Sequence, residues 1–393
     1  MIHLRIFNTL TGNTTEVSDS EEFRMFVCGP TVQDNVHLGH AKTYLAFDLL
    51  ARWLLRSGKK VYFLMNITDV DDKIFDRARR ESSHYVSVAD RFYKAFVEDM
   101  ESLNIVTVSK YARVSKHVED SAELVQELLD SGKAYLLDGN VYFDTSKADR
   151  FGKLSHLSPI DLRLKQIDAA PGKRNSVDFL LWRKISEGKE GIWHTSFGDG
   201  RPGWHIEDSA IAFSEFKGAY DLHGGATELI FPHHEAELAQ DEAISGKIPF
   251  VKIWMHTGLL LKGKEKMSKS LGNVIKIREA LKKFSADEIR LHFLKHHYRD
   301  SFEINEESIS ESQEEYRKLL EAAKIITRIK RHRSDSNESW KEFAADLDDD
   351  LDSPKAVKLL ITIAEQIIYN PSLKFELGPV FWDMAETLGL GLV

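Results

Sequence analysis

The sequence predicts an α/β fold in which a parallel sheet carries an inserted subdomain and is followed by an all-α helical bundle. Short apolar runs at Arg24–Cys28 and Lys60–Ile67 are separated by a helix-like run at Gly39–Arg56. Strands that alternate with helices favour a parallel sheet, with ligands at the carboxyl ends of its strands. From about Ala286 onward the pattern is helical almost throughout, which predicts the bundle.

The middle of the chain predicts helices first and then a region of irregular backbone. Helices are expected at Val86–Leu103 and Val114–Leu129, the second ending at Ser131-Gly132. A short hairpin is expected over Tyr135–Asp144, turning at Asp138-Gly139-Asn140. The stretch Leu154–Gly203 is rich in Gly, Pro, Lys and Asp, so we expect an irregular insertion there.

Sheet character is predicted to return near residue 227. We expect a strand at Thr227–Phe231, a helix at His233–Ile244 and a strand at Phe250–His256. The terminal helices are separated by the polar segments Ser334–Ser339 and Asn370–Ser372. These elements divide the chain into the first half of the sheet domain (residues 1–110), the insertion (111–225), the second half of the sheet domain (226–285) and the bundle (286–393).

Composition indicates a globular enzyme of two or three domains. The 393 residues are 42% hydrophobic and 29% charged. No apolar run approaches the length of a membrane span, and Met1–Arg5 does not begin a secretory signal, so no membrane partner is expected. One cysteine allows no internal disulfide, which fits a cytoplasmic location. The net charge of −9 argues against a protein that is covered by nucleic acid. A local basic surface can still bind a structured RNA.

The segment His37-Leu38-Gly39-His40 follows a predicted strand and opens an apolar-periodic helix. It therefore places two imidazoles at a helix N-terminus, where free N–H groups and the helix dipole favour phosphate. Gly39 lacks a Cβ, so an adenine ring could approach the backbone closely. The alternative interpretation is a pair of histidines that only cap the helix.

A second segment, Lys266-Met267-Ser268-Lys269-Ser270, lies in a polar stretch far along the chain. Lys266 and Lys269 can reach a triphosphate and stabilise the charge that builds on pyrophosphate. The alternative is a solvated basic loop. Both segments together, in this order, predict a protein that binds ATP and activates a carboxylate by adenylation.

Four further residues form a candidate metal site. His233 and Glu237 are four positions apart on a predicted helix and share one face. Cys28 ends a strand in the predicted crevice, and Asp208 offers a further carboxylate. Thiolate, imidazole and carboxylate all bind zinc. The alternatives are a solvated His–Glu pair and a buried cysteine that acts as a small hydrophobe.

With these residues in hand, the chain resembles the cysteinyl-tRNA synthetases, which are class I aminoacyl-tRNA synthetases. The resemblance covers essentially the whole chain. Its matching segments are Phe26–Val32, His37–Thr43, Asn66–Ile74, Asp178–Trp182, Gly200–Glu207, Phe231–Glu237, Lys266–Asn273 and Asp348–Asp350.

The resemblance implies a Rossmann-like catalytic domain that ligates L-cysteine to tRNA(Cys) through a cysteinyl-adenylate, consuming ATP with Mg and releasing AMP and diphosphate. It implies that a zinc ion binds the substrate thiolate, so that cysteine is separated from serine. By motif, the implied roles are zinc binding by Cys28, Asp208, His233 and Glu237, substrate contact by Cys28, Thr68 and Trp204, and ATP binding and catalysis by His37, Gly39, His40, Lys266 and Lys269.

Two departures from the family pattern stand out. Asp208 occupies the position of a family cysteine, which makes the ligand set harder, and we hypothesise that zinc still binds. Typical members also continue past Val393 into a small domain that helps to read the anticodon, so this chain is expected to be a short form. A basic helix end is a candidate contact to tRNA phosphates, or equally a solvated helix terminus: Lys324, Arg328, Lys330, Arg331 and Arg333.

Two rival functions remain at this point. Short paralogues of the family join cysteine to an amino-sugar in mycothiol synthesis, by the same adenylation chemistry. A degenerate synthetase-like protein that binds RNA without catalysis is the second rival, and Asp208 is its main support. Cysteine-dependent exchange between ATP and pyrophosphate separates the latter from both enzymes, and the acceptor then separates the two enzymes.

Overall fold

The computed structural model describes residues 3–185, 190–263, 265–267, 272–327 and 333–392. Its centre is a five-stranded sheet in the order β11-β10-β3-β4-β5, and every neighbouring pair of strands is parallel. The predicted α/β fold with a parallel sheet is therefore confirmed. The strands are β3 (Glu22–Val27), β4 (Lys60–Ile67), β5 (Lys110–Arg113), β10 (Tyr220–Ala226) and β11 (Val251–Thr257).

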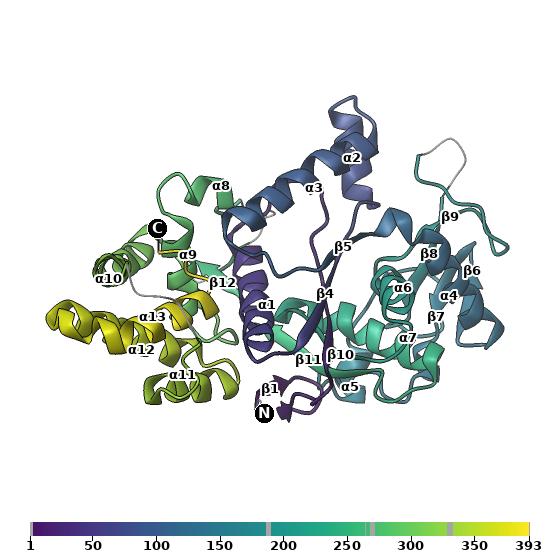
Figure 1. Cartoon of the computed structure of the whole chain (residues 1–393). Coiled ribbons are helices and arrows are strands. Elements are labelled where there is room, and N and C mark those ends of the chain that lie inside the picture. The colour runs from purple at the N-terminus through teal and green to yellow at the C-terminus, as the bar shows by residue number, and fades with distance from the viewer. Residues whose placement is uncertain (1–2, 186–189, 264, 268–271, 328–332, 393) are drawn as a thin grey trace.

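Helices make the crossovers between these strands, as Figure 1 shows. The chain moves outward from β3 to β4 and β5, then returns to the other side of β3 as β10 and β11. The strand order therefore reverses between β3 and β10, and an open α/β sheet binds ligands at the carboxyl end of this switch point. The crossover helices are α1 (Leu38–Arg56), α2 (Asp72–Arg80), α3 (Tyr85–Ser102) and α7 (Glu235–Ser245).

The insertion contains a second, antiparallel sheet in the order β6-β7-β8-β9. The predicted hairpin is confirmed as β6 (Ala134–Leu137) and β7 (Asn140–Phe143), with Asp138 and Gly139 at φ 52° and 83° in its turn. The expectation of irregular backbone is wrong for β8 (Phe179–Lys184) and β9 (Gly200–Pro202). The first four residues of β8 are all buried, so the strand lacks the alternating pattern that marks a strand with one solvated face.

The predicted strand at Thr227–Phe231 is also wrong. These residues form short helical turns, and the sheet strand β10 ends at Ala226, just before them. Gly224 and Gly225 make strand β10 hard to predict from the sequence, because glycine is a poor strand former. The fold nevertheless requires one of them: a Cβ on Gly224 would lie 2.3 Å from the Phe47 ring. With β5 and β10 in the sheet, the inserted segment runs from about residue 114 to 219.

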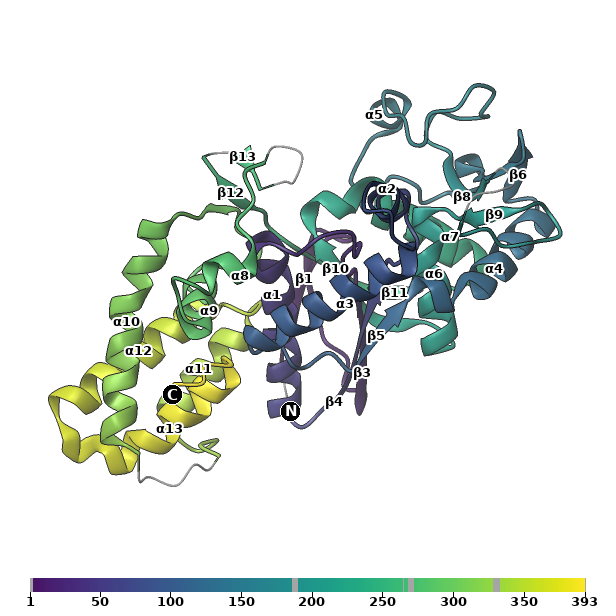
Figure 2. The ribbon, with the colours of Figure 1, turned by 90° about the horizontal axis from the view of Figure 1, so that it is seen from above.

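The remaining elements lie around this frame. The C-terminal third is helical, as predicted, and Figure 2 shows its helices on the opposite side of the sheet from the insertion. Among the described residues, no helix is both long enough and apolar enough to cross a membrane. The other strands are β1 (Arg5–Asn8), β2 (Asn13–Glu16), β12 (Leu260–Lys262), β13 (Glu265–Lys266) and β14 (Phe302–Glu303). The other helices are η1 (Val114–Lys116), α4 (Val118–Asp130), η2 (Thr145–Lys147), α5 (Pro159–Arg163), α6 (Trp204–Phe216), η3 (Thr227–Leu229), η4 (Ile230–His234), α8 (Ile277–Ala280), α9 (Ala286–Leu294), α10 (Glu306–Ile325), α11 (Glu338–Asp348), α12 (Ser353–Tyr369), η6 (Pro371–Leu373) and α13 (Lys374–Thr387).

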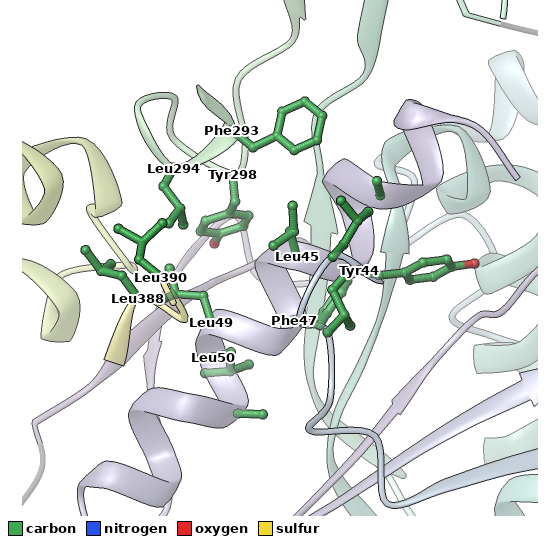
Figure 3. Packing of buried hydrophobic residues seen from close by; sticks show 14 of the residues in the cluster. Tyr44, Leu45, Phe47, Leu49, Leu50, Phe293, Leu294, Tyr298, Leu388 and Leu390 are labelled. Atoms are coloured by element: carbon green, nitrogen blue, oxygen red, sulfur yellow. The ribbon is translucent and has the colours of Figure 1, made fainter. Parts of the chain in front are cut away.

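One apolar core joins the bundle to α1. Figure 3 shows Leu45 and Leu49 of α1 beside Leu294 and the C-terminal residues Leu388 and Leu390, and all five are buried. Burial of this apolar surface holds the bundle against the sheet domain.

A buried ion pair lies within this core. Arg290 of α9 pairs with Asp48 of α1, and both side chains are fully buried. The Arg290 guanidinium also donates to the backbone carbonyls of Leu388, Leu103 and Asn104 at 2.6, 3.3 and 3.2 Å. Burial works against ionisation of Asp48, but Arg290 and Arg52 outweigh it and hold the pKa of this carboxyl below its ordinary value. Arg290 therefore ties helix α1, the loop after α3 and the C-terminal segment together.

We expect Arg290→Met to destabilise the protein by about 3–5 kcal/mol, because it leaves the Asp48 carboxylate buried without its main partner. Denaturant unfolding of both proteins measures this difference. Arg317→Met is the matched control: Arg317 pairs with Glu314 at an exposed position, and its loss should cost at most about 0.5 kcal/mol. Equal unfolding midpoints for the two variants would contradict this account.

Candidate functional site

The two histidines of His37-Leu38-Gly39-His40 begin helix α1 as predicted. His37 is the N-cap, and its Nδ1 accepts the Gly39 N–H at 3.1 Å. His40 Nδ1 accepts the His37 N–H at 3.3 Å, which completes a capping box. The capping interpretation is therefore correct as far as it goes, but both imidazoles also line a cavity.

This cavity, of about 160 Å³, unites the two segments that predicted ATP binding. Its lining includes His37, Gly39 and His40 of the first segment, Lys266 of the second, and Cys28. It opens where β3 and β10 end, at the switch point of the sheet. We refer to it as the adenylation cavity.

Lys266 projects from strand β13, which forms a hairpin with β12 beside the adenylation cavity. Its Nζ lies 3.0 Å from Glu228 Oε2, so the lysine has an acidic partner that also lines the cavity. A triphosphate would compete with this carboxylate for the ammonium group. Lys269 lies outside the described residues.

The four residues predicted to bind a metal meet at one buried point. Cys28 Sγ lies 3.1 Å from Asp208 Oδ2, although 180 positions separate the two residues in the chain. His233 Nε2 lies 3.4 Å from Asp208 Oδ2 and 3.0 Å from Glu237 Oε1. One donor atom from each residue lies within 4.8 Å of the other three. We refer to Cys28, Asp208, His233 and Glu237 as the donor cluster.

The electrostatics of the donor cluster suit a divalent cation. Burial raises the pKa of the Cys28 thiol, and the Asp208 and Glu237 carboxylates raise it further. Burial works to lower the pKa of His233, but Glu237 and Asp208 outweigh it and raise it to about 9. Without a cation, the Cys28 thiol and the His233 imidazole therefore retain their protons at neutral pH. One sulfur, one nitrogen and two oxygen donors are a chemically competent set for zinc.

Two histidines beside the donor cluster were missed by the sequence analysis. His234 Nε2 lies 3.1 Å from Cys28 Sγ, and His223 Nε2 lies 3.0 Å from Glu237 Oε2. Together with Cys28 and Glu237, they form a second set of close donor atoms. His234 stands directly after His233 and could have been noticed, whereas His223 lies in the strand that the sequence analysis misplaced.

Asn66 was also missed, and it orients the carboxylate of Asp208. Its side-chain amide donates to Asp208 Oδ1 at 2.5 Å, and its side-chain oxygen accepts the Gly29 N–H at 2.5 Å. Gly29 is required here, because a Cβ would lie 1.8 Å from the Asn66 carbonyl oxygen. This arrangement leaves Asp208 Oδ2 facing Cys28 and His233.

Trp204 and Thr68 are not among the residues that line the adenylation cavity. Trp204 is 46% exposed, and its ring stacks on His233 with centroids 4.1 Å apart. Thr68 is buried at the end of β4, where its carbonyl accepts the Val32 N–H at 3.1 Å. Trp204 therefore covers the imidazole of His233, while Thr68 fixes the loop after β3.

Comparison with known proteins identifies the family. A family model described as the tRNA synthetases class I (C) catalytic domain matches residues 14–314. A cysteine–tRNA ligase of Thermococcus gammatolerans is 39% identical, over 98% of this chain and 86% of the relative. One of Dehalococcoides mccartyi is 36% identical, over 99% of this chain and 87% of the relative. The chain belongs to the cysteine–tRNA ligase family. It is an enzyme of the class I aminoacyl-tRNA synthetases, as the sequence motifs predicted.

Solved structures of more distant synthetases share the fold of this cysteine–tRNA ligase family member. Mycobacterium tuberculosis methionyl-tRNA synthetase, in complex with methionyl-adenylate, gives a TM-score of 0.64 at 15% identity, covering 94% of this chain and 90% of its own. The Agrobacterium radiobacter K84 agnB2 LeuRS–tRNA–LeuAMS ternary complex gives 0.67 at 11% identity, covering 94% of this chain and 83% of its own. The class I architecture is therefore shared well beyond close relatives.

Alkylation of the single cysteine tests the electrostatics of the donor cluster. A raised pKa leaves less thiolate at neutral pH, so metal-free folded protein should react with iodoacetamide at least about tenfold more slowly than the unfolded chain. The rate should rise only at pH values well above the usual range of a thiol. Mass spectrometry reports Cys28 alone, since the chain has one cysteine. Equal rates in the folded and unfolded chains would contradict the raised pKa.

Proposed function

We propose that the adenylation cavity and the donor cluster together join L-cysteine to tRNA(Cys), through a cysteinyl-adenylate and with release of AMP and diphosphate. One observation carries this proposal: Cys28 belongs to both the cavity lining and the donor cluster. If the side chain of the substrate cysteine binds beside Cys28, the carboxylate of that substrate lies in the same cavity as ATP.

In the first step, the cysteine carboxylate attacks the α-phosphorus of ATP, the bond to the β-phosphate oxygen breaks, and pyrophosphate leaves. The N-terminus of α1 presents the positive end of its helix dipole to the phosphates, and His37 and His40 flank it. Lys266, with Lys269, balances the charge that develops on the leaving pyrophosphate. Magnesium accompanies ATP, and we assign no residue to it.

Selection of cysteine is assigned to the donor cluster. Cys28, Asp208, His233 and Glu237 would hold zinc, which when bound attracts a thiolate far more strongly than an alcohol. Asn66 holds Asp208 in the ligating orientation, and Trp204 shields His233 from solvent. Asp208 supplies a harder donor than the family cysteine, so we expect weaker binding of a soft metal at this site.

In the second step, a hydroxyl of the terminal adenosine of tRNA attacks the adenylate carbonyl, and AMP leaves. We propose that the helical bundle contacts the tRNA backbone through Lys324, in the last turn of α10, and through Arg333. Arg328, Lys330 and Arg331 lie outside the described residues. An enzyme that charges tRNA acts where translation occurs, so we propose a cytoplasmic location.

Charging of purified tRNA(Cys), with serine as competitor, tests the proposed function directly. We expect cysteine-dependent ATP–pyrophosphate exchange, followed by transfer of cysteine to tRNA and rejection of serine. An amino-sugar acceptor in a parallel reaction should remain unmodified. Exchange without charging of any tRNA would overturn the proposal.

Lys266→Ala should lower the rate of ATP–pyrophosphate exchange by about 10²–10³-fold, because one preorganised donor to the developing charge is lost. Lys262→Ala is the matched control on the neighbouring strand β12, since Lys262 lines a different pocket. Its exchange rate should stay within about twofold of wild type, a difference below about 0.5 kcal/mol. Equal losses in the two variants would remove the assigned role from Lys266.

Substitution of Asp208 tests the metal assignment. Asp208→Asn should weaken zinc binding by at least about tenfold, or about 1.4 kcal/mol, and Asp208→Cys should strengthen it, because thiolate is the softer ligand. Competition with a chromophoric chelator measures both affinities. Glu215→Gln, on the same helix α6, is the control and should leave the affinity unchanged. A metal-free wild-type enzyme that still activates cysteine would overturn the assignment.

A further inference from the structure

The segment that carries Lys266 is attached to helix α1 at both of its ends. It leaves the parallel sheet at Gly258, directly after β11, and meets the start of α1 at Ile275. There, the Leu38 N–H donates to the Ile275 carbonyl at 2.9 Å. At the departure, Lys42 Nζ donates to the Gly258 carbonyl at 2.6 Å. A backbone hydrogen bond therefore ties Ile275 to α1, whereas the side chain of Lys42 ties Gly258 to α1.

Lys42 makes this attachment from an apolar surrounding. It is only 4% exposed, and its ammonium also donates to the Tyr298 carbonyl at 3.1 Å and lies 5.4 Å from the Phe302 ring centroid. The Gly258 N–H donates to the same Tyr298 carbonyl at 2.9 Å, which closes a triangle of hydrogen bonds. Burial lowers the pKa of Lys42 to about 7, although Asp300 opposes the shift. Burying an amine to this degree costs free energy. The hydrogen bonds from Lys42 to the Gly258 and Tyr298 carbonyls offset that cost.

Paired strands connect Gly258 to Lys266, so a displacement of Gly258 is transmitted to Lys266. The Leu259 N–H donates to Ser301 Oγ at 2.8 Å, and β12 then pairs with β14 through Leu260 and Phe302. Leu261 of β12 pairs with Lys266 of β13. Leu261, the residue opposite Lys266, thus lies only three positions after Gly258, whose carbonyl Lys42 holds. A shift of Gly258 would therefore move Lys266 relative to the start of α1.

We propose that Lys42 is a positioning residue for adenylation: its side chain fixes the β12–β13 hairpin relative to the first turn of α1. It thereby sets the distance between Lys266 and the phosphates bound near His37 and His40. This inference rests on the proposed function, because it assumes that those residues bind ATP. Since Lys266 acts on the departing pyrophosphate, Lys42 matters for adenylate formation and not for transfer of cysteine to tRNA.

Two single-turnover rates of the full-length enzyme test this inference. Lys42→Met keeps an unbranched apolar stem that is one atom shorter and removes the hydrogen-bond donors. We expect adenylate formation to slow by at least about tenfold at saturating ATP and cysteine, as misplacement of a catalytic group predicts. Transfer of cysteine from preformed cysteinyl-adenylate to tRNA should stay within about twofold of wild type. Lys252→Met is the matched control on β11, at the opposite end of the strand from Gly258, and should leave both rates within the same limit.

A purely structural lysine would lower both rates by the same factor, through the fraction of folded enzyme. Equal factors, or an unchanged rate of adenylate formation, would overturn the inference. If Lys42→Met does not fold, Ser301→Ala carries the same test, because it removes only the hydrogen bond to Leu259 at the same attachment. Wild-type enzyme without cysteine-dependent adenylate formation would refute the proposed function instead, so the two failures are distinguishable.

Discussion

The parallel pairing of β3 with β10 is the constraint on which the site depends. Met25 lies opposite Leu222, Val27 lies opposite Gly224, and the Cys28 N–H donates to the Gly224 carbonyl at 3.0 Å. This register places the only cysteine where the turns after β10 deliver His233. A shift by one residue would turn Cys28 to the other face of the sheet and separate it from the donor cluster.

Much of the fold was predictable because its strongest signals are local. The periodicity of α1 and the continuous apolar runs of β3 and β4 each reflect a single element and its burial. The strands β8 and β10 were missed for different physical reasons. Tertiary burial on both faces removed the alternation of β8, and close contact with Phe47 required glycine at Gly224 of β10.

The candidate site likewise contains residues that could be predicted from the sequence and residues that could not. Residues in short motifs, such as His37, His40 and His233, could be singled out as candidates because such motifs have a fixed local spacing. Asn66 and His223 could not, since each acts through a contact from a sheet strand to a distant helix, which no local pattern encodes. The same applies to Lys42, whose two acceptor carbonyls belong to segments more than 200 residues further along the chain.

His37 carries one more consequence, for how substitutions at this position are interpreted. Folding alone would favour Ser, Asp or Asn at a helix N-cap, and each of these typically contributes about 1 kcal/mol. Imidazole is not among the preferred caps, yet it holds that position at the mouth of the adenylation cavity. Position 37 therefore has to meet two requirements, capping of helix α1 and lining of the adenylation cavity. A library screened only for stability would therefore select better caps at position 37 and lose the imidazole that lines the adenylation cavity.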